Sequence, residues 1–129
     1  MADSIIITTN KGREKLAKAS MGAITLPAIT QIGFGTGGHN IGTGEPTQPD
    51  PAATAVPGEV LKKNIESYTF PIATTASILG ILDQSEGNGH SISAYGLYDS
   101  AGDLIVLMHT VPSPKTAETR FERTITNAF

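Results

Sequence analysis

The sequence predicts an α+β domain that is mainly β: an antiparallel β-sheet or sandwich with one short N-terminal helix and a long Gly/Pro-rich loop. Three observations lead to this class: short β-branched runs bounded by turn residues, one helix pattern near the N-terminus, and a clear β-hairpin pattern in the second half. A chain of 129 residues is expected to form a single domain, 1–129, with one modest core. Because 39% of the residues are apolar, the chain can fill such a core.

The first predicted elements are a strand, a helix and a second strand. The run SIIIT, residues 4–8, is β-branched and predicts a strand. In TNKGREKLAKAS, a cap at Thr9 or Asn10 starts a short helix that ends before Gly22. A helix this short is not stable alone, so we expect it to dock on a sheet. Alternating side chains predict the next strand over residues 28–34.

A long surface loop is predicted at about residues 35–58. Glycine, proline and threonine dominate this stretch. Its prolines cannot donate backbone hydrogen bonds, which disfavours a strand or helix there; they are Pro46, Pro49, Pro51 and Pro57. A loop of this length in a small domain is typically functional or poorly ordered.

The second half of the chain predicts further strands. Residues 60–70 are amphipathic and strand-like, and they also allow a helical first turn. The apolar run 77–82 predicts a buried strand. The hairpin is predicted from 92–98 and 104–110, joined by a glycine-containing turn at 99–103.

One more strand is predicted after the hairpin. Pro112 and Pro114 predict a break, because proline cannot complete the ladder of a sheet. The segment ETRFERTITNAF then alternates apolar and polar residues, which predicts a last, half-exposed strand. In total we expect one helix and about six strands, without a fixed-period repeat.

Composition argues against several classes of protein. The net charge is −3 and no cluster of Lys and Arg is present, so nucleic-acid binding is not expected. The absence of cysteine removes disulfides and thiolate metal sites. No stretch approaches the roughly 20 apolar residues that span a bilayer, so membrane insertion is not expected. The positive charges near the N-terminus follow the apolar run there, unlike in a signal peptide, which favours a protein made in the cytoplasm.

The spacing Gly33-x-Gly35-x-x-Gly38 matches the dinucleotide-binding fingerprint in its simplest form. That fingerprint needs a helix at its third glycine, because the helix N-terminus binds the pyrophosphate. The segment that follows, HNIGTGEPTQP, cannot form a helix. We therefore interpret the glycines as a loosened exit from the strand into a mobile loop, and we expect no cofactor.

No reaction centre is predicted. The spacing of His39, His90 and His109 does not bring them together as metal ligands or as a proton-transfer pair. Local hydrogen bonding in turns explains the acidic residues that lie in or beside them: Asp83, Glu86, Asp99 and Asp103. We therefore expect no metal within one copy of the chain, no catalytic residue and no enzymatic activity; a metal ion on a symmetry axis, bound by one histidine of each copy, stays open.

Two tyrosines are candidates for a surface role. Tyr95 and Tyr98 lie three positions apart on a predicted strand, so they point to opposite faces of the sheet. We expect one ring in the core. We expect the other at a surface or an interface, where an aromatic ring with a polar tip is useful.

Three segments carry a family resemblance, and their order and spacing agree over nearly the whole chain. They are the opening IIITTNKGREKLAKAS, the strand with its glycine-rich exit ITQIGFGTGGH, and YGLYDSAGDLIVL. They resemble the N-terminal domain of the tail-collar fibre proteins of contractile-tailed bacteriophages and their prophage relatives. One departure is Ala94, because the family often has an acidic residue at that position. Any contact which that acidic side chain makes in relatives is not expected here.

The resemblance implies a structural virion protein and not an enzyme. Such domains attach a tail fibre to the baseplate, while the far end of the fibre serves host attachment. The implied location is the virion tail, after synthesis in the bacterial host cytoplasm. The implied partners are other copies of the chain, typically as a trimer, and a phage baseplate or tail protein.

The residues expected to contact partners lie on the first strand, at the strand exit, in the loop, on the tyrosine strand and at the C-terminus. They are Ile5, Ile6, Ile7, Phe34, His39, Ile41, Tyr95, Tyr98 and Phe129. Exposed loops and terminal strands often carry binding, because a rigid body holds them in place.

Three other functions stay open from the sequence. A small carbohydrate-binding module for host recognition would need an exposed aromatic platform, and only 5% of the residues are aromatic, with no Trp. A small enzyme would need converging titratable groups. A decoration protein of the phage head or tail tube belongs to the same structural class as a fibre domain.

Overall fold

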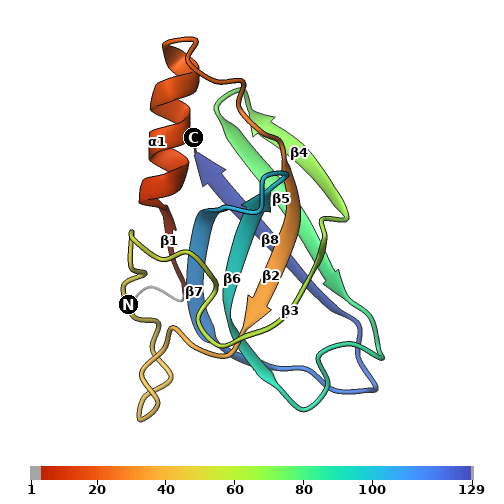
Figure 1. Cartoon of the computed structure of the whole chain (residues 1–129). Helices are drawn as coiled ribbons and strands as arrows, with labels where there is room; N and C mark the ends of the chain where they lie inside the picture. The colour runs from red at the N-terminus through yellow and green to blue at the C-terminus, as the bar shows by residue number, and fades with distance from the viewer. Residues whose placement is uncertain (1–3, 129) are drawn as a thin grey trace.

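The structure of the chain is a computed structural model that describes residues 4–128. Within them the chain forms one helix and eight strands (Figure 1). The elements are β1 (Ser4–Thr8), α1 (Asn10–Ser20), β2 (Ile29–Gly35), β3 (Glu59–Asn64), β4 (Ser67–Ile72), β5 (Thr75–Leu82), β6 (Ser91–Asp99), β7 (Leu104–Pro114) and β8 (Phe121–Ala128). All strand pairs are antiparallel. The predicted mainly β, antiparallel fold with one short helix is confirmed.

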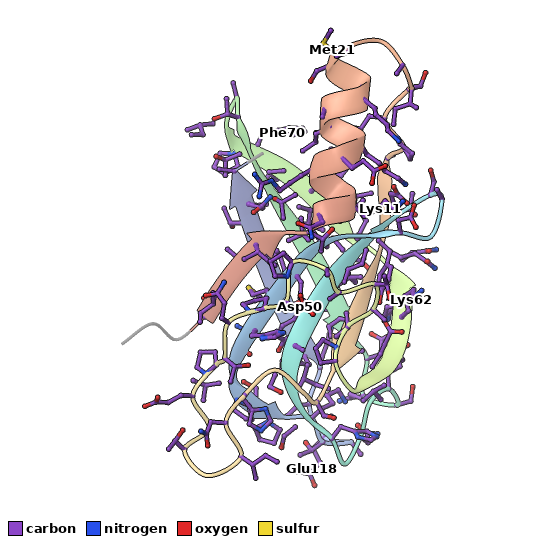
Figure 2. All side chains as sticks on the ribbon, turned by 60° about the vertical axis from the view of Figure 1, so that its left-hand side comes forward. Lys11, Met21, Asp50, Lys62, Phe70 and Glu118 are labelled. Carbon is purple, nitrogen blue, oxygen red and sulfur yellow. The ribbon has the colours of Figure 1, made fainter. Side chains whose placement is uncertain are left out.

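The strands form two sheets. The five-stranded sheet has the order β1-β7-β6-β2-β3, and the three-stranded sheet has the order β4-β5-β8. In both views of the whole chain, α1 and the turn between β4 and β5 lie at the same end of the molecule (Figures 1 and 2). The strand order leaves β1 and β3 at the edges of the larger sheet, and β4 and β8 at the edges of the smaller one.

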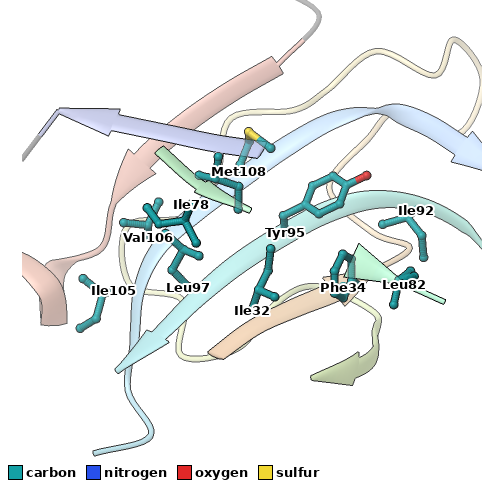
Figure 3. Close-up of a cluster of buried hydrophobic side chains, with 11 residues drawn as sticks. Ile32, Phe34, Ile78, Leu82, Ile92, Tyr95, Leu97, Ile105, Val106 and Met108 are labelled. Carbon is teal, nitrogen blue, oxygen red and sulfur yellow. The ribbon is translucent and has the colours of Figure 1, made fainter. Parts of the chain in front are cut away.

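The main core lies between the two sheets. Apolar side chains from β2, β6 and β7 meet side chains from β5 and β8 (Figure 3). The Phe34 and Tyr95 rings meet edge to face, with their centroids 5.7 Å apart. The core residues are Ile32, Phe34, Ile78, Leu82, Ile92, Tyr95, Leu97, Ile105, Val106, Met108 and Ile125. Strand β4 contributes no side chain to this cluster, so the core holds the smaller sheet through β5 and β8.

The opposite face of the larger sheet is covered by the segment between β2 and β3, residues 36–58. Val56 and Ala53 from this segment pack against sheet residues Ala94, Tyr98, Leu104 and Leu107. Figure 2 shows Asp50, also from this segment, in front of the larger sheet. The segment contains turns and an isolated bridge between His39 and Pro46. It therefore follows the sheet face as a third layer without adding a strand.

Helix α1 begins where the sequence predicts. The Thr9 side-chain oxygen accepts a hydrogen bond from the Gly12 N–H at 3.1 Å, which satisfies one of the free amides of the first turn. The same hydroxyl donates to the Leu104 carbonyl at 2.6 Å, so the cap also ties the helix to β7. A Cβ on Gly12 would lie 2.8 Å from the Ile105 carbonyl oxygen. Glycine at this position therefore lets the helix approach the sheet closely.

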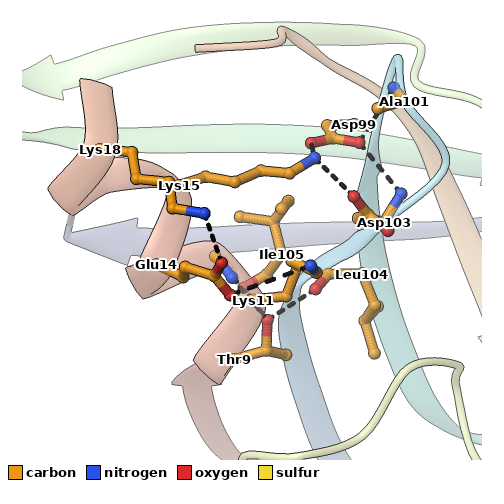
Figure 4. A network of polar contacts seen from close by, with 11 residues as sticks. Thr9, Lys11, Glu14, Lys15, Lys18, Asp99, Ala101, Asp103, Leu104 and Ile105 are labelled. Carbon is orange, nitrogen blue, oxygen red and sulfur yellow. Dashed lines mark hydrogen bonds and ion pairs between the residues drawn. The ribbon is translucent and has the colours of Figure 1, made fainter. Parts of the chain in front are cut away.

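The turn between β6 and β7 is built around Asp99, as predicted. Its Oδ1 accepts hydrogen bonds from the N–H groups of Ala101 and Asp103, each at 3.0 Å. Lys15 of α1 forms ion pairs with Asp99 and with Asp103 (Figure 4). Hydrogen bonds to Asp103 and Asp99 raise the pKa of Lys15, and the hydrogen bond from Lys15 lowers the pKa of Asp103. The ion pairs therefore fix the helix to the hairpin.

Two local predictions are wrong. Residues 60–70 contain no helical turn, because β3 pairs with the edge of β2 and β4 follows after a two-residue link. Strand β7 runs through Pro112 to Pro114 and does not break. Only residues 106–110 of β7 pair with β1, so the prolines lie where β7 has one neighbour, β6, and a missing N–H can face away from it.

Candidate partner-binding surfaces

The glycines after Phe34 make room for the chain's own loop. A Cβ on Gly35 would overlap the Pro57 carbonyl oxygen, and a Cβ on Gly37 would lie 2.7 Å from the Pro57 Cβ. A Cβ on Gly38 would lie 2.6 Å from the His109 ring. Side chains at these positions would push residues 36–58 off the sheet.

The amides in this stretch are already used. The Thr36 N–H donates to the Gly58 carbonyl and the Gly37 N–H donates to the Pro57 carbonyl, both at 3.1 Å. A phosphate cradle needs such amides aimed at a ligand and a helix behind them. Here the amides bind the loop and β2 is followed by turns, so the glycines serve close packing. The interpretation that they loosen the chain is wrong.

Side-chain hydrogen bonds hold residues 36–58, the covering segment, on β6. Ser93 donates to the Gly37 carbonyl at 2.7 Å, which leaves its oxygen free to accept from His39 Nδ1 at 2.8 Å. His39, a predicted contact residue, is therefore half-buried and engaged within the chain. Its ring therefore helps to hold residues 36–58 on β6.

His109 lies beneath the same segment. Its Nδ1 is 2.9 Å from the Thr47 carbonyl, so Nδ1 carries the proton and donates. Its Nε2 is buried without a hydrogen-bond partner among residues 4–128. Burial lowers the pKa of His109, and the hydrogen bond to Thr47 offsets only part of this. The neutral ring is therefore the form that the folded chain accommodates.

Tyr95 and Tyr98 point to opposite faces of the larger sheet, as predicted, but both are buried. The expectation that one ring is exposed is wrong, because the covering segment closes the face on which Tyr98 lies. The Tyr98 hydroxyl accepts from the Val56 N–H at 3.0 Å and donates to Glu59 Oε1 at 2.7 Å. Burial and the hydrogen bond to Glu59 raise the pKa of Tyr98. Phe34 is also in the interior, so these three rings offer no surface to a partner.

The remaining predicted contact residues lie on β1 and at the tip of the loop. Within the described residues β1 pairs with β7 alone, and Ile5, Ile6 and Ile7 are half-buried along this edge strand. Ile41 is 94% exposed at the loop tip. Phe129 lies outside the described residues.

Strand β4 carries an apolar surface that sequence reasoning missed. Tyr68, Phe70 and Ile72 are 62%, 64% and 62% exposed, although they are large apolar side chains. The Tyr68 and Phe70 rings contact each other edge to face, with centroids 5.7 Å apart. In the described part of the chain β4 pairs only with β5, and all six of its residues are exposed. We call these three side chains the β4 patch.

A second exposed apolar set lies in the connection between α1 and β2. Met21, Ile24 and Leu26 are 85%, 37% and 46% exposed. Figures 1 and 2 both place this connection at the end of the molecule that also holds the turn after β4. We call these three side chains the connection patch. The sequence signal for both patches is a long stretch without charge: no Asp, Glu, Lys or Arg occurs at 19–44 or at 67–82.

Two further structural findings concern residues 4–128. Their one helix is too short and too polar to cross a membrane. No three His, Asp or Glu side chains among these residues are grouped so that they could hold a metal ion.

Comparison with known proteins identifies a family. Residues 1–127 match the family model described as phage tail-collar fibre protein, N-terminal. The match includes α1 and the strands of both sheets, up to Asn127 in β8. No curated protein and no solved structure matches the chain.

Proposed function

The chain belongs to the phage tail-collar fibre N-terminal family, and we propose that it attaches a tail fibre to the baseplate and assembles with copies of itself, as a trimer. Membership makes it a structural domain of a phage tail fibre, with a place in the virion tail and other tail components as its associates. The proposal adds the attachment point and the self-association.

The observation that carries the self-association is the β4 patch. Folded chains usually cover large apolar side chains, and a contiguous exposed group marks an interaction site. An edge strand with free backbone groups is also a liability unless another element covers it. Tyr68, Phe70 and Ile72 combine both features on a strand that has no neighbour beyond β5 in the described residues.

Two other elements support attachment to a different protein. Strand β1 is a second free edge within the described residues, and an extended partner segment can pair with such an edge. The loop tip projects Ile41 into solvent, while the rest of the segment is fastened to the sheet. A rigidly held tip can enter a pocket of a baseplate protein at a low entropic cost.

Two measurements test the proposal. Light scattering on the purified chain is expected to give the mass of a trimer, and a monomer at high concentration would contradict self-association. Electron microscopy of phage particles labelled with an antibody against the chain is expected to show label at the baseplate. Label on the head or along the tail tube would favour a decoration protein instead.

Carbohydrate binding is a second candidate, which the exposed Tyr68 and Phe70 rings favour. Stacking on sugars needs a flat aromatic platform with polar neighbours. The two rings are inclined at 72° to each other, so they do not share one plane. A glycan array is expected to show no binding; reproducible binding that is lost in Tyr68→Ala would favour the carbohydrate function.

A further inference from the structure

We infer that the β4 patch of one copy packs on the connection patch of the next copy, and that this contact closes the ring of the trimer. The inference rests on the proposed self-association and names its surfaces. Tyr68, Phe70 and Ile72 would contact Met21, Ile24 and Leu26 of the neighbouring copy. The occupant of each patch is thus a second copy of this chain.

The symmetry of a trimer calls for two different patches. Away from the rotation axis, a patch that pairs with its own copy generates a twofold dimer, whereas a ring of three joins one patch to a second patch of different composition. The exposed large apolar side chains of the described residues fall mainly into two such groups, the β4 patch and the connection patch. Ile41 and Val111 are the members that lie outside both.

The position of the patches allows the ring to close. In cyclic symmetry, a patch and its partner must lie at the same height along the rotation axis, since otherwise the assembly climbs into a filament. Both patches lie toward one end of the molecule, in two views related by rotation about the vertical axis (Figures 1 and 2). An axis along that direction would keep the two patches at a similar height in every copy.

The charge pattern also fits a contact between copies. The chain has a net charge of −3, so a contact between copies through uncharged surfaces adds no like-charge repulsion at the contact. Both patches lie in the stretches without Asp, Glu, Lys or Arg, residues 19–44 and 67–82. Burying them against each other removes large apolar side chains from water and leaves no charge of either patch unpaired.

Charge substitutions test the pairing of the two patches. Phe70→Lys and Leu26→Glu each place a charge in one half of the contact, and each is expected to weaken association by about 100-fold or more, giving monomers. The double variant Phe70→Lys/Leu26→Glu presents opposite charges across the same contact and is expected to regain the trimer. Sedimentation velocity gives the mass, and circular dichroism shows that each variant is folded.

The matched control is Val111→Lys. Val111 is 45% exposed, close to the 46% of Leu26, but it lies on β7 outside both patches. This variant is expected to remain a trimer. A wild-type monomer would overturn the self-association itself. A wild-type trimer that both single variants retain, or that the double variant fails to restore, would overturn the patch pairing alone.

Discussion

The two sheets differ in how far their outer apolar side chains are covered from solvent. On the larger sheet, residues 36–58 lie over Tyr98 and Leu107, and both side chains are buried. On β4 of the smaller sheet, Tyr68 and Phe70 stay largely in solvent. The first face is closed by the chain's own backbone, and the second is left open.

The exposure of apolar side chains on β4 is a feature of that strand and not of both sheets. The chain places a long segment over one face and keeps it there with glycines and side-chain hydrogen bonds. No comparable cover reaches β4 within the described residues. The closed face is therefore expected to govern folding stability, and the open strand is expected to govern association. The four predictions that follow test this division.

The largest effect is expected for Gly35→Ala. The added Cβ overlaps the Pro57 carbonyl, so the covering segment must shift, and we expect a loss of about 3 kcal/mol of folding stability. Urea denaturation measures it. The control is Gly42→Ala at the loop tip, where the only near atom is the Asn40 side-chain oxygen at 3.3 Å, and a change within about 0.5 kcal/mol is expected. Equal losses of stability in both variants would contradict a close fit of residues 36–58 on the larger sheet.

A pair of tyrosine substitutions compares the two regions directly. Tyr98→Phe leaves the Val56 N–H without its acceptor and is expected to cost about 2 kcal/mol in folding stability. Tyr68→Phe on β4 removes a hydroxyl from a mostly exposed ring and is expected to change stability by less than about 0.5 kcal/mol. Thermal unfolding of both variants gives the difference. Similar stability changes in the two variants would show that the Tyr98 hydroxyl does not hold residues 36–58 on the sheet.

The pH dependence of stability is expected to report on His109. Its pKa in the folded chain is lowered by burial, while the unfolded chain has a value of about 6.5. Below pH 6.5 the unfolded state takes up the proton first, so stability falls with falling pH, by at most about 1.4 kcal/mol per pH unit. Denaturation at pH 7.5, 6.5 and 5.5 measures the slope.

Substitution of the histidines assigns this slope. His109→Gln is expected to flatten the profile, because the buried titrating group is gone. His90→Gln, the same substitution at an exposed position, is the matched control. If His109→Gln keeps the wild-type dependence of stability on pH, a group other than His109 controls that dependence.

The smallest effect on folding is expected at the open strand. Ile72→Thr keeps a β-branched side chain at an exposed position, so a change below about 0.5 kcal/mol is expected when the monomer is measured. Ile125→Thr is the matched substitution in β8 of the same sheet, where the side chain is fully buried, and a loss of about 3 kcal/mol is expected. A large loss in Ile72→Thr would mean that β4 belongs to the folding core.

Parts of the fold and of the site could be predicted, and others could not. The cap at Thr9 and the turn at Asp99 follow from side-chain hydrogen bonds to backbone groups a few residues away. The opposite directions of Tyr95 and Tyr98 follow from the alternation of a strand. Their common burial does not, because the segment that covers Tyr98 comes from another part of the chain. The β4 patch escaped prediction for a similar reason, since Tyr68, Phe70 and Ile72 have the pattern of a buried strand.

The sequence by itself determined the antiparallel, mainly β class, the helix after the first strand, the hairpin and the family. The first three depend on local periodicity, on caps and on turn residues, all of which act over a few positions, whereas the family follows from the resemblance of three sequence segments. Only the tertiary structure decided three features. The glycines after Phe34 let residues 36–58 pack closely on the larger sheet, β7 continues through Pro112, and β4 stays exposed to solvent. Burial is a property of which segments meet in space. That outcome depends on contacts between distant parts of the chain, which no local pattern contains.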